Sequence, residues 1–236
     1  NTQFSGDGKT VNVILDDNSE IYTDGTNYLP TATSVTYNRE ILADGGMYSF
    51  FVPFDIPAGQ AAELGKFYQY SGHDPEERKV YFDDIAEVSD GVVKANTAYF
   101  FKPARDITSF TVNNPSIPRT LTIPDPEYPS VPGLYGTYSQ IDIPVGAYGY
   151  GNRGFFIKAG TDNLLRPFRA YLWLGSGAYM AKASAIFGDY DVDAIELIGA
   201  DDLDLNAPIY NLRGLRITTP KKGEIYIQNG KKVIKK

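Results

Sequence analysis

A glycine-rich loop in the second half of the chain carries residue types that could bind a ligand. Residues 149–154, GYGNRG, match the spacing of a dinucleotide-binding loop, but such a loop needs a strand before it and a helix after it. A strand-like run follows here, so we expect no nucleotide. Tyr148 and Tyr150 instead lie beside Asn152 and Arg153, and aromatic rings next to polar groups are how proteins hold sugar faces. The loop therefore predicts either a glycan site or an ordinary hairpin loop.

Tyr171 and Trp173 form a second aromatic candidate, because they alternate along one face of the apolar run 164–174. The opposite face carries Leu172 and Leu174, which we expect to lie in the core. The face with Tyr171 and Trp173 is either a second core layer or an exposed aromatic platform. In the exposed case both rings would belong to the predicted glycan site.

Two acidic runs could supply oxygen ligands for a metal ion. Asp189, Asp191 and Asp193 form the first run, and residues 201–204 contain the second. Ca²⁺ needs six to eight oxygens in a turn-rich cage, and neither run has the glycine and terminal glutamate of an EF-hand loop. We therefore predict no cofactor, with Ca²⁺ at Asp189, Asp191 and Asp193 or a merely solvated acidic loop as the two alternatives.

Catalytic candidates are few. The chain has no Cys, which excludes disulfides, thiolate metal sites and a Cys nucleophile. Its one His, His73, would have to serve any Ser-His-Asp triad, and no G-x-S-x-G motif accompanies it. A glycosidase needs only two suitably spaced carboxylates, and none of the 29 acidic residues forms an obvious pair. We predict that the protein is not an enzyme, with a carboxylate-based glycan hydrolase as an alternative.

Composition and charge narrow the class of protein. Tyr (18) and Phe (13) far outnumber Met (2), which favours pleated, half-buried surfaces. A net charge of −7 argues against nucleic acid as a partner. No apolar run approaches the roughly 20 residues of a membrane span, so we predict no transmembrane segment. The first residues are polar and lack an initiator Met, so we expect a removed N-terminal signal.

Short strands separated by strong turns account for most of the chain. Alternating apolar residues and Gly or Asp turns recur along its length, and no long helix is needed. This pattern predicts an all-β protein, a β-sandwich or two tandem β-sandwich units. The expected strands include residues 34–41, 48–54, 79–88, 92–103, 107–112, 155–158, 164–174 and 179–187.

An internal echo suggests how such units would be related. Both 92–103 and 164–174 place a basic residue five positions before a Tyr and continue into an apolar run. We interpret them as degenerate copies of one β unit, with chance similarity between strand-rich segments as the alternative. Upstream, residues 55–59 resemble 142–146, and 65–68 resemble 154–157.

These patterns divide the chain into four predicted parts. Residues 1–112 form an N-terminal β-sandwich unit, and 133–206 form a second β unit. The prolines of 113–132 forbid regular strand ladders, so this segment is either a linker or a crossing within one domain. Residues 207–236 form a C-terminal hairpin tail, because Asn-Gly at 229–230 favours a type I′ turn.

Several of these segments resemble a β module found in surface and secreted proteins of Bacteroidetes. The resemblance lies in residues 34–40, 48–54, 94–99 and 167–171. In such proteins the module often follows leucine-rich repeats or other adhesin-like arrays. Residues 209–214, 223–227 and 230–233 are similar to the C-terminal tail of these proteins, which resembles the sorting domain of type IX secretion.

The resemblance implies an extracellular or outer-membrane cell-surface location and brings no catalytic residues. Attachment would use the removed N-terminal signal or the tail, and the tail is either a sorting signal or part of the fold. The expected function is a secreted or surface-anchored, non-enzymatic module for cell adhesion or carbohydrate binding. Its partner would be a glycan or a host or extracellular matrix protein. The alternative is a structural spacer with no ligand of its own.

Overall fold

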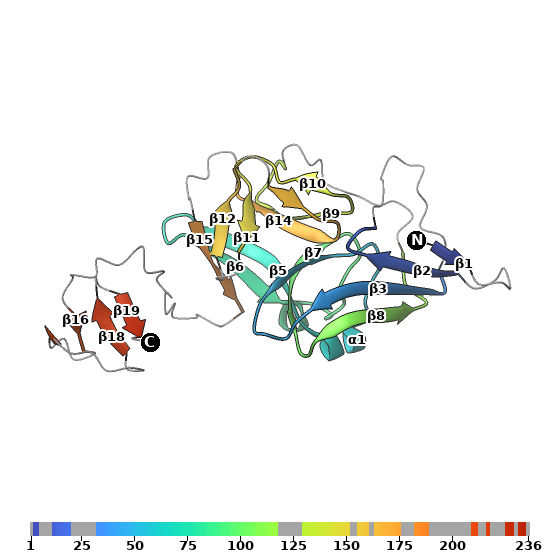
Figure 1. The fold of residues 1–236 in the computed structure, drawn as a ribbon, viewed down its shortest axis with the longest axis horizontal. Helices are drawn as coiled ribbons and strands as arrows, with labels where there is room; N and C mark the ends of the chain where they lie inside the picture. The colour runs from blue at the N-terminus through green and yellow to red at the C-terminus, as the bar shows by residue number, and fades with distance from the viewer. Residues whose placement is uncertain are drawn as a thin grey trace. The chain divides into compact units, whose positions relative to one another are not determined.

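The computed structural model confirms an all-β protein, with 53% strand and 7% helix (Figure 1). The chain forms two compact units, Asn1–Asp189 and Tyr190–Lys236. The β-sandwich form of the fold stays a prediction. The structure describes residues 2–4, 11–19, 32–117, 129–151, 155–160, 163–175, 182–188, 209–211, 216–217, 225–228 and 231–234.

A four-stranded sheet forms one layer of the first unit, in the order β1-β2-β3-β8. β2 and β3 are parallel, and the other two pairings are antiparallel. Alternate residues of β3, beginning with Val35 and Tyr37, point into the core as their spacing predicts. The strands are β1 (Thr2–Phe4), β2 (Val11–Asp16), β3 (Ser34–Ile41) and β8 (Ile107–Asn113).

A nine-stranded sheet forms the rest of the unit, in the order β4-β7-β5-β6-β15-β12-β11-β14-β9. Its parallel pairing of β15 with β6 joins strands from both halves of the chain, so the predicted ranges 1–112 and 133–206 share one sheet. The strands are β4 (Tyr48–Phe51), β5 (Gly65–Asp74), β6 (Lys79–Asp84), β7 (Ala98–Pro103), β9 (Gly133–Thr137), β11 (Tyr148–Tyr150), β12 (Phe155–Lys158), β14 (Arg169–Trp173) and β15 (Lys182–Phe187).

Two short helices and a two-stranded ladder complete the described part of this unit. Helix α1 (Ala58–Leu64) precedes β5, and helix α2 (Ile85–Val88) follows β6. The Asp84 carboxylate caps α2 by accepting a hydrogen bond from the Ala86 N–H at 3.0 Å. β10 (Ile141–Asp142) and β13 (Leu164–Leu165) form a two-stranded ladder next to β14.

The nine-stranded sheet is nearly closed. Phe100 of β7 and Phe156 of β12 have ring centroids 5.6 Å apart, although three strands separate β7 from β12. In a flat sheet these strands would lie about 19 Å apart. Strong curvature therefore brings the two rings together across the concave face. That face encloses Tyr68, Val80, Phe82, Phe100, Tyr148, Phe156, Leu172, Leu174 and Ala183.

The two ends of this sheet meet where β4 lies against β14 and β9, a contact that we call the seam. The Ala170 N–H donates to Ser49 Oγ at 3.2 Å across it. The ring of Phe51 covers Gly136, where an added Cβ would lie 2.0 Å from Phe51 Cγ. In both contacts a side chain of β4 meets the backbone of β14 or β9.

The convex face of the nine-stranded sheet packs on the four-stranded sheet. Tyr37 of β3 has its ring centroid 5.8 Å from that of Phe50 and 5.4 Å from that of Phe168. A third, smaller cluster covers the outer side of β14 and contains Tyr171 and Trp173. β14 is therefore buried on both faces. This packing fixes the position of the strand and of the polar residue at its start, Arg169.

The two segments of the sequence echo have the same local geometry. Asn96 precedes β7 with φ 58°, and Phe168 precedes β14 with φ 60°. The Asn96 N–H donates to Val52 O at 2.9 Å, and the Phe168 N–H donates to Thr137 O at 2.8 Å. Positive φ is uncommon outside glycine, so its recurrence at equivalent positions supports an internal repeat. The repeated strand pairs are β4 with β7 and β9 with β14.

The second unit contains a small antiparallel sheet in the order β17-β16-β18-β19. Gln228 of β18 pairs with Lys231 of β19, which leaves a loop of the two-residue length that favours a hairpin. The strands are β16 (Ile209–Tyr210), β17 (Arg216–Ile217), β18 (Ile225–Gln228) and β19 (Lys231–Ile234).

Candidate functional site

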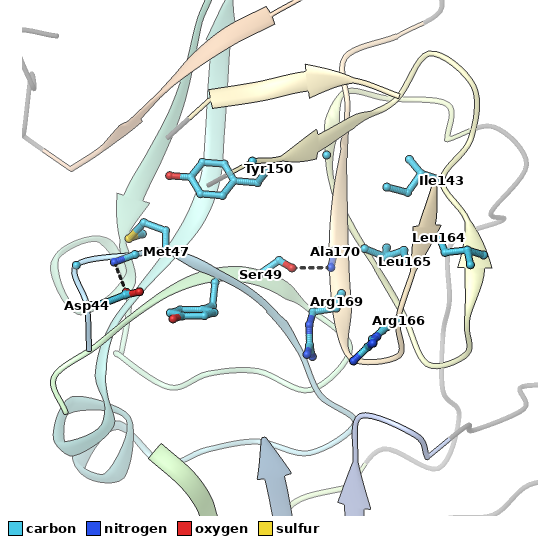
Figure 2. Close-up of a pocket in the computed structure, with 15 residues that line it drawn as sticks. Asp44, Met47, Ser49, Ile143, Tyr150, Leu164, Leu165, Arg166, Arg169 and Ala170 are labelled. Atoms are coloured by element: carbon cyan, nitrogen blue, oxygen red, sulfur yellow. Dashed lines mark hydrogen bonds between the residues drawn. The ribbon is translucent and has the colours of Figure 1, made fainter. Parts of the chain in front are cut away.

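A pocket of about 630 Å³ lies beside the seam (Figure 2). Four parts of the chain line it: the turn and strand start at 44–49, Ile143, residues 149–151 at the end of β11, and residues between 164 and 170 around the start of β14. Figure 2 shows Met47 and Tyr150 on one side of the hydrogen bond between Ser49 and Ala170, with Ile143 and the 164–166 segment on the other. The lining residues are Asp44, Gly45, Gly46, Met47, Tyr48, Ser49, Ile143, Gly149, Tyr150, Gly151, Leu164, Leu165, Arg166, Arg169 and Ala170.

The turn before β4 shapes one wall of the pocket. Asp44 Oδ1 accepts a hydrogen bond from the Gly46 N–H at 2.8 Å, and Gly45 has φ 88°. A side chain at Gly45 would be strained in this conformation. The Tyr48 hydroxyl donates to Leu42 O at 3.1 Å and holds the chain that enters the turn. The wall is therefore fixed by local hydrogen bonds.

Tyr150 supplies aromatic surface on another wall. Its ring centroid lies 4.8 Å from that of Phe100 and 5.3 Å from that of Phe156. Burial raises the pKa of Tyr150 to about 12, so its hydroxyl is neutral at ordinary pH. The ring thus extends the aromatic cluster of the concave face to the edge of the pocket.

Two arginines reach the pocket from the start of β14. Arg166 is exposed, whereas the Arg169 side chain is only 16% exposed. Arg169 Nη2 donates to Asp17 Oδ2 at 2.7 Å, an ion pair that connects β14 to the residue after β2. Arg169 Nη1 also lies 3.4 Å from the Tyr37 hydroxyl and from Pro167 O. Arg169 is therefore held in one orientation, while Arg166 is free to adjust.

A third arginine, Arg39 of β3, lies directly behind the pocket wall and is 7% exposed. Its Nη1 donates to Ser49 O at 2.8 Å, and its guanidinium carbon lies 5.6 Å from the Tyr48 ring centroid. Burial lowers the pKa of Arg39 to about 10, and the like charge of Arg169 contributes to the shift. Arg39 stays protonated at neutral pH, so this side of the pocket is cationic.

Three of the aromatic residues predicted to bind a glycan are buried. Tyr148 packs in the concave face, and Tyr171 and Trp173 lie in the third cluster at 2% and 4% exposure. The alternative of an exposed aromatic platform is therefore wrong, and the face with Tyr171 and Trp173 is a second core layer. Residues of β10 and the following loop, including Ile143, cover both rings. None of the three presents a ring face to a ligand in this structure.

Tyr150 is the predicted ligand-binding residue that does line the pocket. Asn152 and Arg153 lie outside the described residues, and so does the predicted calcium run Asp189, Asp191 and Asp193. Within the described part of the chain, no group of three or more His, Asp or Glu side chains is placed to hold a metal ion. In the same part, no helix is long and apolar enough to cross a membrane.

The sequence did not identify the arginines as site residues. Arg166 was recognised only as the basic residue five positions before Tyr171, and Arg39 only as part of an alternating strand face. The available signal was that alternation, since it places Arg39 among the buried positions of β3, where an arginine needs polar partners. No spacing rule connects residue 39 with residues 166 and 169, because only the tertiary fold brings them together.

The pocket combines features suited to binding a small polar ligand. Guanidinium groups form paired hydrogen bonds with carboxylates or other oxyanions, and Tyr150 and Leu165 offer apolar surface. Among the described lining residues, Asp44 is the one carboxylate, and its Oδ1 already accepts the turn hydrogen bond. The described lining therefore offers cationic, aromatic and aliphatic groups together with one carboxylate.

No family model, curated protein or solved structure matches the chain. The similarity of its segments to surface modules of Bacteroidetes remains a prediction. The chemistry of its ligand follows from the side chains around the pocket.

Proposed function

We propose that the protein is a non-enzymatic module that binds carbohydrate outside the cell, and that the pocket at the seam is its binding site. The observation that carries this proposal is the pocket itself, about 630 Å³ in volume, with aromatic, aliphatic and guanidinium groups on facing walls. Ligand pockets of proteins commonly enclose about 300–1,000 Å³. The volume suits one or two sugar rings.

Sugar chemistry matches this mixture of groups. A sugar ring has an apolar C–H face and a rim of hydroxyls, so its site needs flat apolar surface beside hydrogen-bonding groups. Tyr150 and Leu165 supply the apolar surface, and Ser49 and Arg166 can supply the hydrogen-bonding groups. The hydrogen bond from Ala170 to Ser49 and the packing of Tyr150 on Phe100 hold these two side chains in place before a ligand arrives, which limits the entropic cost of binding. Arg166 is free to adjust.

A binding role also agrees with the carboxylates near the pocket. A glycosidase needs an acid and a second carboxylate about 5 to 9.5 Å apart. Asp44 is engaged in its turn, and Asp17 is engaged with Arg169. Binding without hydrolysis is therefore the function that the described groups support best, and the hydrolase stays the alternative.

The proposed location is extracellular or at the outer cell surface, and it rests on the resemblance of the sequence to Bacteroidetes surface modules. A removed N-terminal signal or the C-terminal tail would provide the attachment. A glycan of a host cell, of a plant or of a matrix protein would then be the partner in adhesion. Calcium at Asp189, Asp191 and Asp193 stays a prediction, so binding should be measured with calcium and with a chelator.

The experiment that tests the proposal is an array of host and plant glycans and matrix proteins, probed with the parent chain and a pocket-filling variant. Gly149 is suited to this substitution, because an added Cβ there would have its nearest contact, Ile143 Cδ1, at an ordinary 3.7 Å. We expect Gly149→Leu to fold and to abolish binding. Gly72→Leu is the matched control, since Gly72 also lies on a strand and has open space around its Cα.

Two results would contradict the proposal. If the parent chain binds nothing on the array, the protein acts instead as a spacer in a surface assembly. If Gly149→Leu binds as the parent does, the ligand uses another surface. Release of reducing sugar by the parent chain would favour the hydrolase.

A further inference from the structure

The charges around the pocket are unevenly distributed. Arg166 and Arg169 line it, and Arg39 lies behind the wall formed by Tyr48 and Ser49. Among the described lining residues the two guanidinium groups stand against one carboxylate, Asp44, and Asp17 lies behind Arg169 as its ion-pair partner. The whole chain carries a net charge of −7. A cationic pocket therefore lies in a protein that is acidic overall.

Each of these two carboxylates uses one oxygen in a described contact, and Asp17 Oδ1 is buried without a hydrogen-bond partner among the described residues. Asp17 Oδ2 accepts from Arg169 at 2.7 Å, and Asp44 Oδ1 accepts from the backbone N–H of Gly46. Arg39 donates to the Ser49 carbonyl and lies over the Tyr48 ring, and the negative charge of Asp17 partly offsets its own. The described partners therefore leave a positive charge beside the pocket.

Burial strengthens the effect of this charge. Two charges interact more strongly in the protein interior than in water, because the effective dielectric constant is lower. The lowered pKa of Arg39 reflects both its burial and the nearby charge of Arg169. An anion in the pocket would offset the repulsion between these two arginines, whereas a neutral ligand would leave it in place.

We infer that the pocket selects sugars that carry an acidic group, a carboxylate or a sulfate ester, over neutral sugars of the same shape. This inference rests on the proposed carbohydrate-binding function and specifies the substrate class of that site. Arg166 forms paired hydrogen bonds with the acidic group. Arg169 and Arg39 supply fixed positive charge, and the sugar ring packs between Tyr150 and Leu165.

The test compares acidic sugars with matched neutral partners. The probes are sialyllactose with its methyl ester, and trigalacturonic acid with its methyl ester, measured by titration calorimetry at low salt. We expect the acidic member of at least one pair to bind about tenfold or more tightly, as the loss of a charged hydrogen bond implies. Raising the salt concentration should weaken the acidic sugar more than the neutral one.

Charge reversal at Arg166 locates the effect. Arg166 is exposed, so Arg166→Glu should fold normally and lose the preference for the acidic sugar. Arg105→Glu is the matched control, because Arg105 is also exposed and lies between β7 and β8, outside the pocket lining. A folded Arg166→Glu variant that keeps the preference would overturn the inference.

Failure of this inference can be distinguished from failure of the proposed function. Equal or tighter binding of the neutral sugars, abolished by Gly149→Leu, would overturn acid selection and leave the carbohydrate-binding function in place. If the parent chain binds no probe here and nothing on the glycan array, both are wrong.

Discussion

Two strand pairs of the nine-stranded sheet, β4 with β7 and β9 with β14, share one geometry and differ in what their side chains do. Phe50 pairs with Tyr99 in the first, and Tyr135 pairs with Tyr171 in the second. In each pair a residue with positive φ donates its N–H to a backbone carbonyl, that of Val52 just after β4 or that of Thr137 at the end of β9. The backbone is thus a shared scaffold, and the differences lie in the side chains that it carries.

The first difference is one of size, at positions 51 and 136. These residues are equivalent, because Phe51 pairs with Ala98 and Gly136 pairs with Ala170. The two positions face each other across the seam, and the space there holds only one ring. Phe51 fills it and also packs on Tyr138, with ring centroids 4.4 Å apart. A side chain at both positions would therefore overlap, so the two strand pairs differ in residue size at this contact.

The second difference is one of charge, at the basic residue before the strand. Lys94 of the first copy forms an exposed ion pair with Asp90 at 2.9 Å. Its equivalent, Arg166, lines the pocket, and Arg169 reaches out to Asp17. The basic residue of the first copy forms an ion pair with a nearby residue of the chain, whereas the arginines of the second copy line the pocket. Binding chemistry can thus be added to one copy of a scaffold without altering the backbone.

The largest expected effect is on stability at the seam. Phe51→Ala should lower the free energy of unfolding by about 3–5 kcal/mol, because it empties a buried ring site. Gly136→Ala should lower it by about 1–3 kcal/mol, because the new Cβ overlaps the Phe51 ring. Urea unfolding followed by the fluorescence of Trp173, the single tryptophan, measures both.

A double variant sharpens this result. With Phe51 already replaced by Ala, Gly136→Ala should cost much less than it does alone, since its clash is gone. Gly149→Ala is the control, because its Cβ meets only ordinary contacts. Additive costs in the double variant would contradict the direct packing of Phe51 on Gly136.

A smaller effect on stability is expected from the ion pairs Asp17–Arg169 and Asp90–Lys94, which differ in burial. Asp17→Ala leaves the largely buried Arg169 guanidinium without its carboxylate, so the free energy of unfolding should fall by about 1–2 kcal/mol. Asp90→Ala breaks the exposed ion pair of Asp90 with Lys94 and should leave stability unchanged, since solvent screens exposed charges. The same urea titration measures both variants. Equal losses would show that burial does not distinguish the two pairs.

The sequence was sufficient to predict the all-β fold, because alternation and turns are local signals. It also located the echo of 92–103 in 164–174, which the structure matches with equivalent hydrogen bonds at Asn96 and Phe168. The alternation that marked Tyr171 and Trp173 could not show whether their face is covered. That depends on β10 and its following loop folding over β14, which is a tertiary contact.

The pocket could not be predicted from the sequence either, because tertiary contacts form it. Its walls come from residues near 44, 149 and 166, which meet only because the sheet curves until β4 reaches β14. Curvature of this kind is set by the packing of Phe82, Phe100 and Phe156 on the concave face. Those residues were each expected in strands, but a strand pattern alone does not give the order of strands in a sheet.

The smallest effect concerns a hydrogen bond between the residue after β9 and the positive-φ residue before β7. The Tyr138 hydroxyl donates to Asn96 Oδ1 at 2.6 Å, and burial raises the pKa of Tyr138 well above its usual range. Tyr138→Phe should lower the free energy of unfolding by about 1 kcal/mol at pH 7, because Asn96 loses its donor. The measurement is urea unfolding at a series of pH values.

The pH dependence gives the sharper test. A tyrosine with a raised pKa in the folded state stabilises the protein fully below pH ~10, where the unfolded chain also keeps its proton. As the pH rises above 10, the unfolded state loses the proton first, so stability falls. The parent should therefore lose about 1.4 kcal/mol more than Tyr138→Phe for each pH unit above 10. The gap between the two should close near pH ~11 and reverse above it. Parallel curves would mean that Tyr138 ionises normally and that this contact between the copies is open to solvent.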